Sequence, residues 1–66
     1  MTYYINTENT GLNTDEQAQE VSRILSSKGH DVAFTCNYGL VNNSACPCSE
    51  TEWEMALIAA DKAFSA

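Results

Sequence analysis

The run from Ser49 to Phe64 constrains the fold of this chain more than any other stretch. Ser49 is followed three residues later by Glu52, the spacing of a capping box, in which each side chain bonds a backbone N–H at the start of a helix. Pro47 lies just upstream and disfavours an earlier helical start. The interior is rich in Ala, Leu and Met, which are good helix formers. Together these features predict a helix over residues 49–64.

One side of this predicted helix is apolar, as expected for a helix that packs on a core. At about 100° per residue, that side collects Trp53, Ala56, Leu57, Ala60, Ala63 and Phe64. Along its edge runs a row of carboxylates, from Glu50, Glu54 and Asp61. Met55, Ile58 and Lys62 fall on the far side, where large exposed apolar residues can mark a contact surface.

The first 29 residues predict a strand, a loop and a helix. Tyr3–Ile5 is aromatic and β-branched, which favours a strand with its first and third side chains on one face. Residues 6–13 are polar and contain a glycine, so they predict a loop. Residues 14–28 are amphipathic and predict a helix, which Gly29 would end in a left-handed conformation.

This first helix has two candidate starts. Thr14 with Gln17 fits a capping box, and Asn13 with Glu16 fits the same motif one residue earlier. In either register the apolar side contains Ala18, Val21, Ile24 and Leu25.

The middle of the chain predicts a second strand and a shorter third one. Asp31–Cys36 alternates so that Val32, Phe34 and Cys36 share the face directed at the core. Leu40–Asn42 fits a short strand that would pair with the second as a hairpin.

The order of these elements predicts an α+β fold in one small domain over residues 1–66. Its pattern is β-α-β-(β)-α, with a two- or three-stranded sheet and two helices packed on one face. If the first two strands pair in parallel, the helix between them forms a right-handed crossover. With 66 residues, the chain is near the lower size limit for folding on a single core.

The charge balance restricts the partners that this chain can bind. It has nine acidic and three basic residues, for a net charge of −6. Direct nucleic-acid binding needs Lys and Arg to replace phosphate counterions, and anionic membranes repel negative charge. The composition therefore favours a partner with a basic surface.

The cysteines and the single histidine are the candidate residues for a metal site or for redox chemistry. One imidazole and three thiols suffice for tetrahedral zinc: His30, Cys36, Cys46 and Cys48. Zinc sites usually separate paired cysteines by about two to four residues, whereas only Pro47 separates Cys46 from Cys48. The position of Cys48 just before a helix favours a thiolate, but the negative charges of Glu50 and Glu52 oppose it. Familiar redox motifs have two residues between their cysteines, whereas this pair has one. We expect neither a metal nor a cofactor.

These observations predict a non-enzymatic protein-binding module, since no nucleophile–base pair or glycine-rich phosphate loop stands out. By physical type alone, the chain resembles phage or mobile-element antagonists such as anti-CRISPR or anti-restriction proteins. It would inhibit a partner by occupying a basic, nucleic-acid-binding surface. The candidate contact residues are Asp15, Glu16, Glu20, Tyr38, Glu50, Glu54, Met55, Ile58 and Asp61.

The alternative is a structural protein that forms a homodimer through Met55 and Ile58, with its acidity serving only solubility.

The N-terminus lacks the basic and apolar regions of a signal peptide, and no apolar run approaches the roughly 20 residues of a membrane span. Three cysteines is an odd number, which also favours reduced thiols and a cytoplasmic location.

Overall fold

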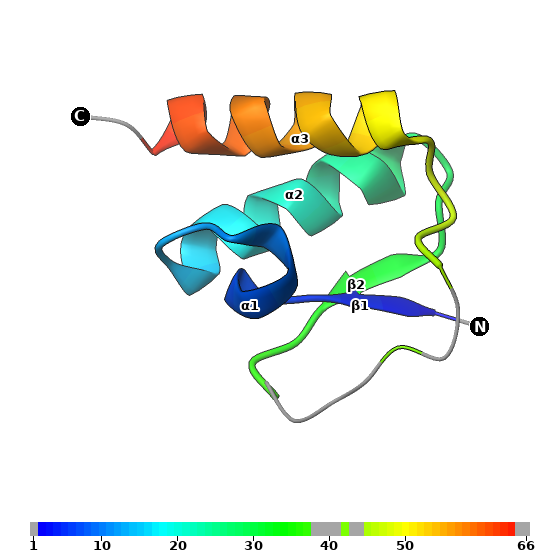
Figure 1. Ribbon diagram of the computed structural model, residues 1–66, viewed down its shortest axis with the longest axis horizontal. Helices are drawn as coiled ribbons and strands as arrows, with labels where there is room; N and C mark the ends of the chain where they lie inside the picture. The colour runs from blue at the N-terminus through cyan, green and yellow to red at the C-terminus, as the bar shows by residue number, and fades with distance from the viewer. Residues whose placement is uncertain (1, 38–41, 43–44, 65–66) are drawn as a thin grey trace.

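The computed structural model describes residues 2–37, 42 and 45–64. Its elements are β1 (Tyr3–Ile5), α1 (Thr7–Thr10), α2 (Asp15–Ser27), β2 (Val32–Phe34) and α3 (Glu50–Ala63). Figure 1 shows α3 lying along α2, with the two strands below them. The predicted α+β class is confirmed.

The two strands form a parallel sheet, with α2 in the connection between them. Tyr3 lies opposite Val32, and Ile5 lies opposite Phe34. The pairing is extended at both ends, because the Tyr3 amide donates to the Asp31 carbonyl and the Thr35 amide donates to the Ile5 carbonyl, each at 2.9 Å.

The outer edge of β1 is covered by asparagine side chains. Backbone groups alternate in direction along a strand, so those of Tyr4 point away from β2. The Tyr4 amide donates to Oδ1 of Asn42 at 2.8 Å, and Nδ2 of Asn42 donates back to the Tyr4 carbonyl at 2.9 Å. Nδ2 of Asn9 also donates to that carbonyl, at 2.8 Å. These contacts satisfy the backbone amide and carbonyl of Tyr4, which another strand would otherwise pair with at this edge. The predicted third strand falls mostly on residues 40 and 41, outside the described residues.

Both long helices begin as their sequences predict. Thr14 and Gln17 form the capping box of α2, which settles the choice between the two registers. Ser49 and Glu52 form the capping box of α3. Gly29 follows α2 with a φ of 92°, the left-handed conformation predicted for it.

The loop predicted over residues 6–13 is wrong at residues 7–10, which form α1. Asn6 and Asn9 cap this helix reciprocally, each side-chain oxygen accepting from the other residue's amide. Thr10 Oγ1 donates to the Asn6 carbonyl at 2.8 Å and is buried. Asn is a poor residue in a helix interior but a good cap, so propensity alone missed this turn.

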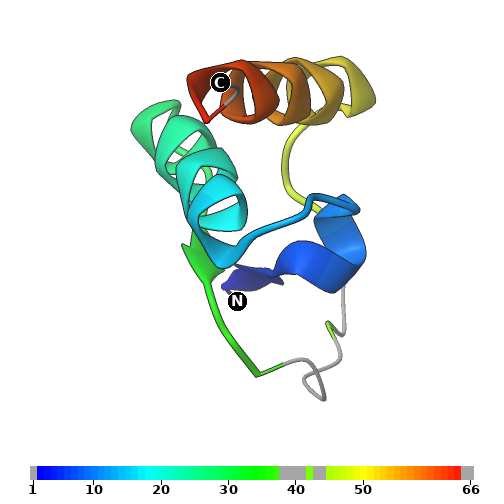
Figure 2. The same ribbon diagram turned by 90° about the vertical axis from the view of Figure 1, so that its left-hand side faces the viewer.

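The core is formed by side chains from both the sheet and the helices. The buried apolar residues are Ile5, Ala18, Val21, Leu25, Val32, Ala56 and Ala60. Trp53 and Leu57 pack against them and are half-buried. The Tyr3 and Trp53 rings meet edge to face, with centroids 6.2 Å apart, so α3 also reaches the sheet. Figure 2 shows α2 and α3 on the same side of the sheet.

Three residues predicted to face the core do not. Phe64 is 47% exposed and Ala63 is exposed, because the last turn of α3 lies at the end of the molecule, beyond the core (Figure 1). Cys36 is exposed because β2 ends at Phe34, two residues earlier than its pattern suggests.

Candidate protein-binding surface

The side of α3 that faces away from the core combines carboxylates with large apolar residues. Since Ala56 and Ala60 are buried, the opposite side of the helix is directed outward. Met55 is 63% exposed and Ile58 is 60% exposed. We define the outer face of α3 as Glu50, Glu54, Met55, Ile58 and Asp61, all of which are exposed.

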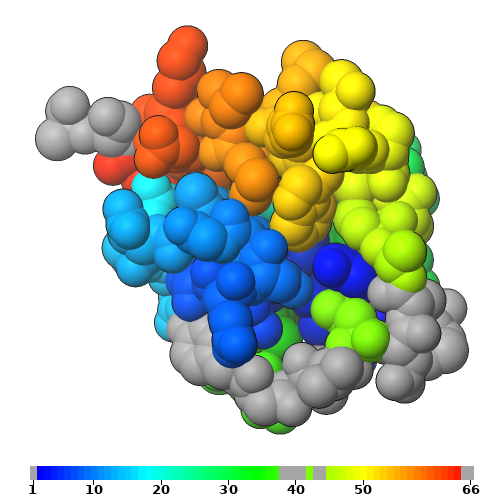
Figure 3. Space-filling view, viewed as in Figure 1, coloured from blue at the N-terminus to red at the C-terminus, as the bar shows by residue number. Residues whose placement is uncertain are grey.

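The members of this face are neighbours on the helix surface. Residues three or four apart lie next to each other, so Ile58 adjoins Met55, Glu54 and Asp61. With a rise of about 1.5 Å per residue, Glu54 and Asp61 lie roughly 10 Å apart along the axis, with Ile58 between them. Figure 3 shows α3 forming one border of the molecular surface. The arrangement places the apolar pair beside the carboxylates on one side, and the exposed Lys62, four residues after Ile58, lies on the other.

Antiparallel packing of the two helices brings the start of α2 to the end of α3. Gln17 Nε2 donates to Asp61 Oδ1 at 3.4 Å. Asp15 and Glu16 lie in the first turn of α2, directly before Gln17, and both are exposed. These two carboxylates also stabilise the helix, because they stand at its positive end. Asp15 and Glu16 thus lie at the same end of the helix pair as Asp61, whereas Glu50 and Glu54 lie in the first turns of α3, toward the other end.

Glu20 has a cation beside it. Arg23 Nε donates to Glu20 Oε1 at 2.7 Å, and Arg23 Nη2 bonds the other oxygen. The hydrogen bond from Arg23 lowers the pKa of Glu20. The carboxylate is ionised, but the guanidinium neutralises its field. Tyr38, the remaining candidate, lies outside the described residues.

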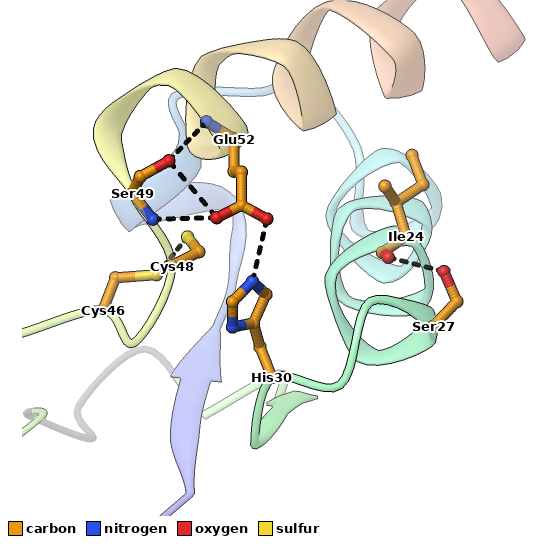
Figure 4. Close-up of polar contacts among 7 residues, drawn as sticks. All are labelled: Ile24, Ser27, His30, Cys46, Cys48, Ser49 and Glu52. Atoms are coloured by element: carbon orange, nitrogen blue, oxygen red, sulfur yellow. Dashed lines mark hydrogen bonds and ion pairs between the residues drawn. The ribbon is translucent and has the colours of Figure 1, made fainter.

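His30 takes part in a contact that the sequence did not reveal. It follows Gly29 after the end of α2, yet its side chain is only 20% exposed. Its Nε2 lies 3.0 Å from Oε2 of Glu52, and the other Glu52 oxygen accepts from the Ser49 amide at 3.2 Å (Figure 4). The hydrogen bond from His30, followed by that from the Ser49 backbone, lowers the pKa of Glu52.

The four residues of the zinc hypothesis do not form a metal site within the described residues. No group of three or more His, Cys, Asp or Glu side chains is arranged there to hold a metal ion. Cys36 is exposed after β2, and His30 is engaged with Glu52. Cys46 and Cys48 alone are brought together, just before α3.

Similarity to other proteins gives no family for this chain, because no protein-family model, curated protein or solved structure matches it. Within the described part of the chain, every helix is too short or too polar to cross a membrane. The longest, α3, has 14 residues.

Proposed function

We propose that this chain is a non-enzymatic protein-binding module whose outer face of α3 docks on a basic surface of a partner protein. The observation that carries the proposal is the exposure of Met55 and Ile58 directly beside Glu54 and Asp61. Such a combination offers both an apolar anchor and charge complementarity to one partner.

Binding would proceed in two stages that use different residues. The net charge of −6 attracts a basic surface over distance and raises the rate of encounter. Met55 and Ile58 then become desolvated against the partner and supply most of the affinity. The carboxylates on either side of Ile58 set the orientation.

A basic protein surface of this kind commonly serves to bind nucleic acid. Occupying it would exclude the DNA or RNA and inhibit the partner. The proposed role is that of a cytoplasmic antagonist of the phage or mobile-element type, such as an anti-CRISPR or anti-restriction protein, and it needs no cofactor.

The test is capture of partners from a host lysate at low salt, followed by elution with a salt gradient and identification by mass spectrometry. Ile58→Ala should weaken binding of the captured partner by about 2 kcal/mol, roughly thirty-fold in Kd. Glu54→Lys should shift elution to lower salt. Glu8→Lys on α1 makes the same charge change at an exposed site away from α3 and is the matched control.

The proposal predicts that Glu8→Lys elutes close to the unmodified chain. Binding that does not respond to salt, or an equal loss from Glu8→Lys and Glu54→Lys, would contradict docking through the outer face of α3.

The alternative, a homodimer, would use the same apolar pair. In a two-fold symmetric dimer, the same face meets its own copy. Two copies of this face would bring their carboxylates close together, and these like charges would repel, so the charge pattern favours a basic partner. Light scattering across a range of concentrations separates the two: a salt-resistant dimer that Ile58→Asp dissociates would support self-association.

A further inference from the structure

Two thiol groups lie next to each other in the segment just before α3. Cys46 Sγ and Cys48 Sγ lie 2.8 Å apart, and one of the two donates a hydrogen bond to the other (Figure 4). Both side chains are half-buried, and Cys48 packs against the core. Cys36, the third cysteine, is exposed after β2 and takes no part in this pair. The pair belongs to neither the outer face of α3 nor the buried core.

The surrounding chain restricts how far these sulfur atoms can separate. Pro47 between them has a fixed φ, which reduces the freedom of the connecting backbone. Ser49, the next residue, is held in place as the N-cap of α3. A disulfide bond is about 2.05 Å long, so bond formation requires only a short approach of the two sulfurs.

The two thiols are chemically unequal. Burial, the hydrogen bond with Cys46 and the charge of Cys46, with a smaller effect from Glu52, raise the pKa of Cys48 to about 12. Cys48 therefore keeps its proton at neutral pH, and its S–H can donate to the sulfur of Cys46. Cys48 is therefore the less reactive of the two thiols, and the first attack is assigned to Cys46.

We propose that Cys46 and Cys48 are a redox modification site, which a low-molecular-weight disulfide such as glutathione disulfide converts to an intramolecular disulfide. In the first step the Cys46 thiolate attacks one sulfur of the oxidant, forming a mixed disulfide and releasing one glutathione thiolate. In the second step Cys48 loses its proton to this thiolate or to water and attacks the Cys46 sulfur, releasing the second glutathione thiolate. Overall, the two cysteines lose two electrons and two protons, and the oxidant becomes two thiols.

The site is suited to reversible modification and not to structural reinforcement. A disulfide across one residue closes a very short loop, so it removes little entropy from the unfolded chain. In reducing compartments, disulfides are usually transient or redox-sensing. Oxidation would consume the Cys48 S–H and fix the backbone that leads into the Ser49–Glu52 cap, so its effect is local to the start of α3.

The experiment uses the full chain with Cys36→Ser, equilibrated with mixtures of glutathione and its disulfide, quenched with acid and analysed by intact mass and peptide mapping. The expected product has lost two hydrogen atoms, retains no glutathione and contains a Cys46–Cys48 link. Folding should favour this disulfide by about tenfold over the same chain unfolded in urea, since the fold brings the sulfurs together.

Two further variants test the order of the steps. With only Cys46 present, in Cys36→Ser/Cys48→Ser, one glutathione should remain bound. With only Cys48, in Cys36→Ser/Cys46→Ser, the reaction should be several-fold slower at neutral pH, because burial against the core still disfavours the Cys48 thiolate after Cys46 is removed. Circular dichroism verifies that each variant is folded.

The wild-type chain provides a check that depends on no substitution, because peptide mapping should again give the Cys46–Cys48 link. The proposal is overturned if the folded Cys36→Ser chain keeps both thiols free or accumulates glutathione on both. It is also overturned if unfolding in urea leaves the equilibrium unchanged.

Discussion

At the scale of single residues, Glu52 connects parts of the chain that are distant in sequence. One of its oxygens caps the start of α3 by accepting from the Ser49 amide, and the other lies 3.0 Å from Nε2 of His30, next to β2. Because an ionised carboxylate only accepts, Nε2 of His30 must carry the proton in this contact. A single side chain thus fixes where α3 begins and where it sits against the end of α2.

This contact predicts a specific response to acid. The folded-state pKa of Glu52 lies below its ordinary value of 4.5, so its contribution to stability is complete above about pH 4.5. That contribution is lost as the pH falls through the lowered folded-state pKa. Glu52→Gln cannot lose a charge, so its stability should fall less than that of the unmodified chain between about pH 5 and pH 3.

Urea denaturation at a series of pH values measures this difference. Glu20 also has a lowered pKa, but it contributes equally to both proteins and cancels in the comparison. Glu50→Gln is the control, since it makes the same chemical change in the first turn of α3 at an exposed side chain. Parallel stability curves for Glu52→Gln and the unmodified chain would show that the His30 contact does not hold in solution.

At the scale of elements, capping decides where the helices begin. The Thr14 hydroxyl accepts from the Gln17 amide at 3.3 Å, and Gln17 Oε1 accepts from the Thr14 amide at 3.2 Å. Gln17 also donates to Asp61 on α3. The start of α2 is therefore stabilised both within its own turn and by the neighbouring helix.

Thr14→Ala removes this cap and should lower the free energy of unfolding by about 1 kcal/mol. Chemical denaturation followed by circular dichroism measures the change. Thr51→Ala makes the same substitution at an exposed site inside α3 and should alter stability by less than about 0.5 kcal/mol. Equal effects at the two sites would mean that the capping bond adds nothing beyond helix propensity.

The packing of α2 on α3 depends on two small residues. Ala56 and Ala60 are almost completely buried, so the helices approach closely where these methyl groups lie. A larger side chain at either position has no space without displacing a neighbour.

Ala60→Leu should therefore destabilise the chain by about 1–3 kcal/mol through overpacking. Ala59→Leu adds the same atoms at the adjacent, exposed position and should be close to neutral. Thermal unfolding of the two variants compares them directly. A neutral Ala60→Leu would indicate that the two helices pack less closely than the structure shows.

At the scale of the whole molecule, one small core serves both layers. A parallel pair of three-residue strands has little stability of its own, so the sheet depends on the side chains that α2 places over it. Ile5, Val32 and Leu25 share this core with the two alanines of α3. The helices and the sheet should therefore unfold together.

Leu25→Ala should cost about 2–5 kcal/mol. A chain of 66 residues has a total stability of roughly 3–10 kcal/mol, so this loss is a large part of the whole. Circular dichroism and the fluorescence of Trp53 should report the same, lowered midpoint, because one cooperative unit carries both signals. Separate midpoints for the two probes would contradict a single shared core.

The sequence by itself determined the features that depend on neighbours along the chain. The capping boxes of α2 and α3 and the left-handed Gly29 are interactions within a few residues, so the local pattern specifies them. The helical period of α3 likewise predicted that Met55 and Ile58 face outward. The order of strand, helix and strand allowed parallel pairing, which the structure then showed.

Only the tertiary structure decided the contacts between distant residues and the places where the core stops. His30 and Glu52 are 22 residues apart, and Asn42 pairs with Tyr4 from 38 residues away, so no local pattern could specify either contact. Phe64 and Cys36 continue apolar patterns, but the core ends before it reaches them. A periodic pattern states which face of a helix or strand is apolar, whereas the packing of the other elements decides how much of that face is covered.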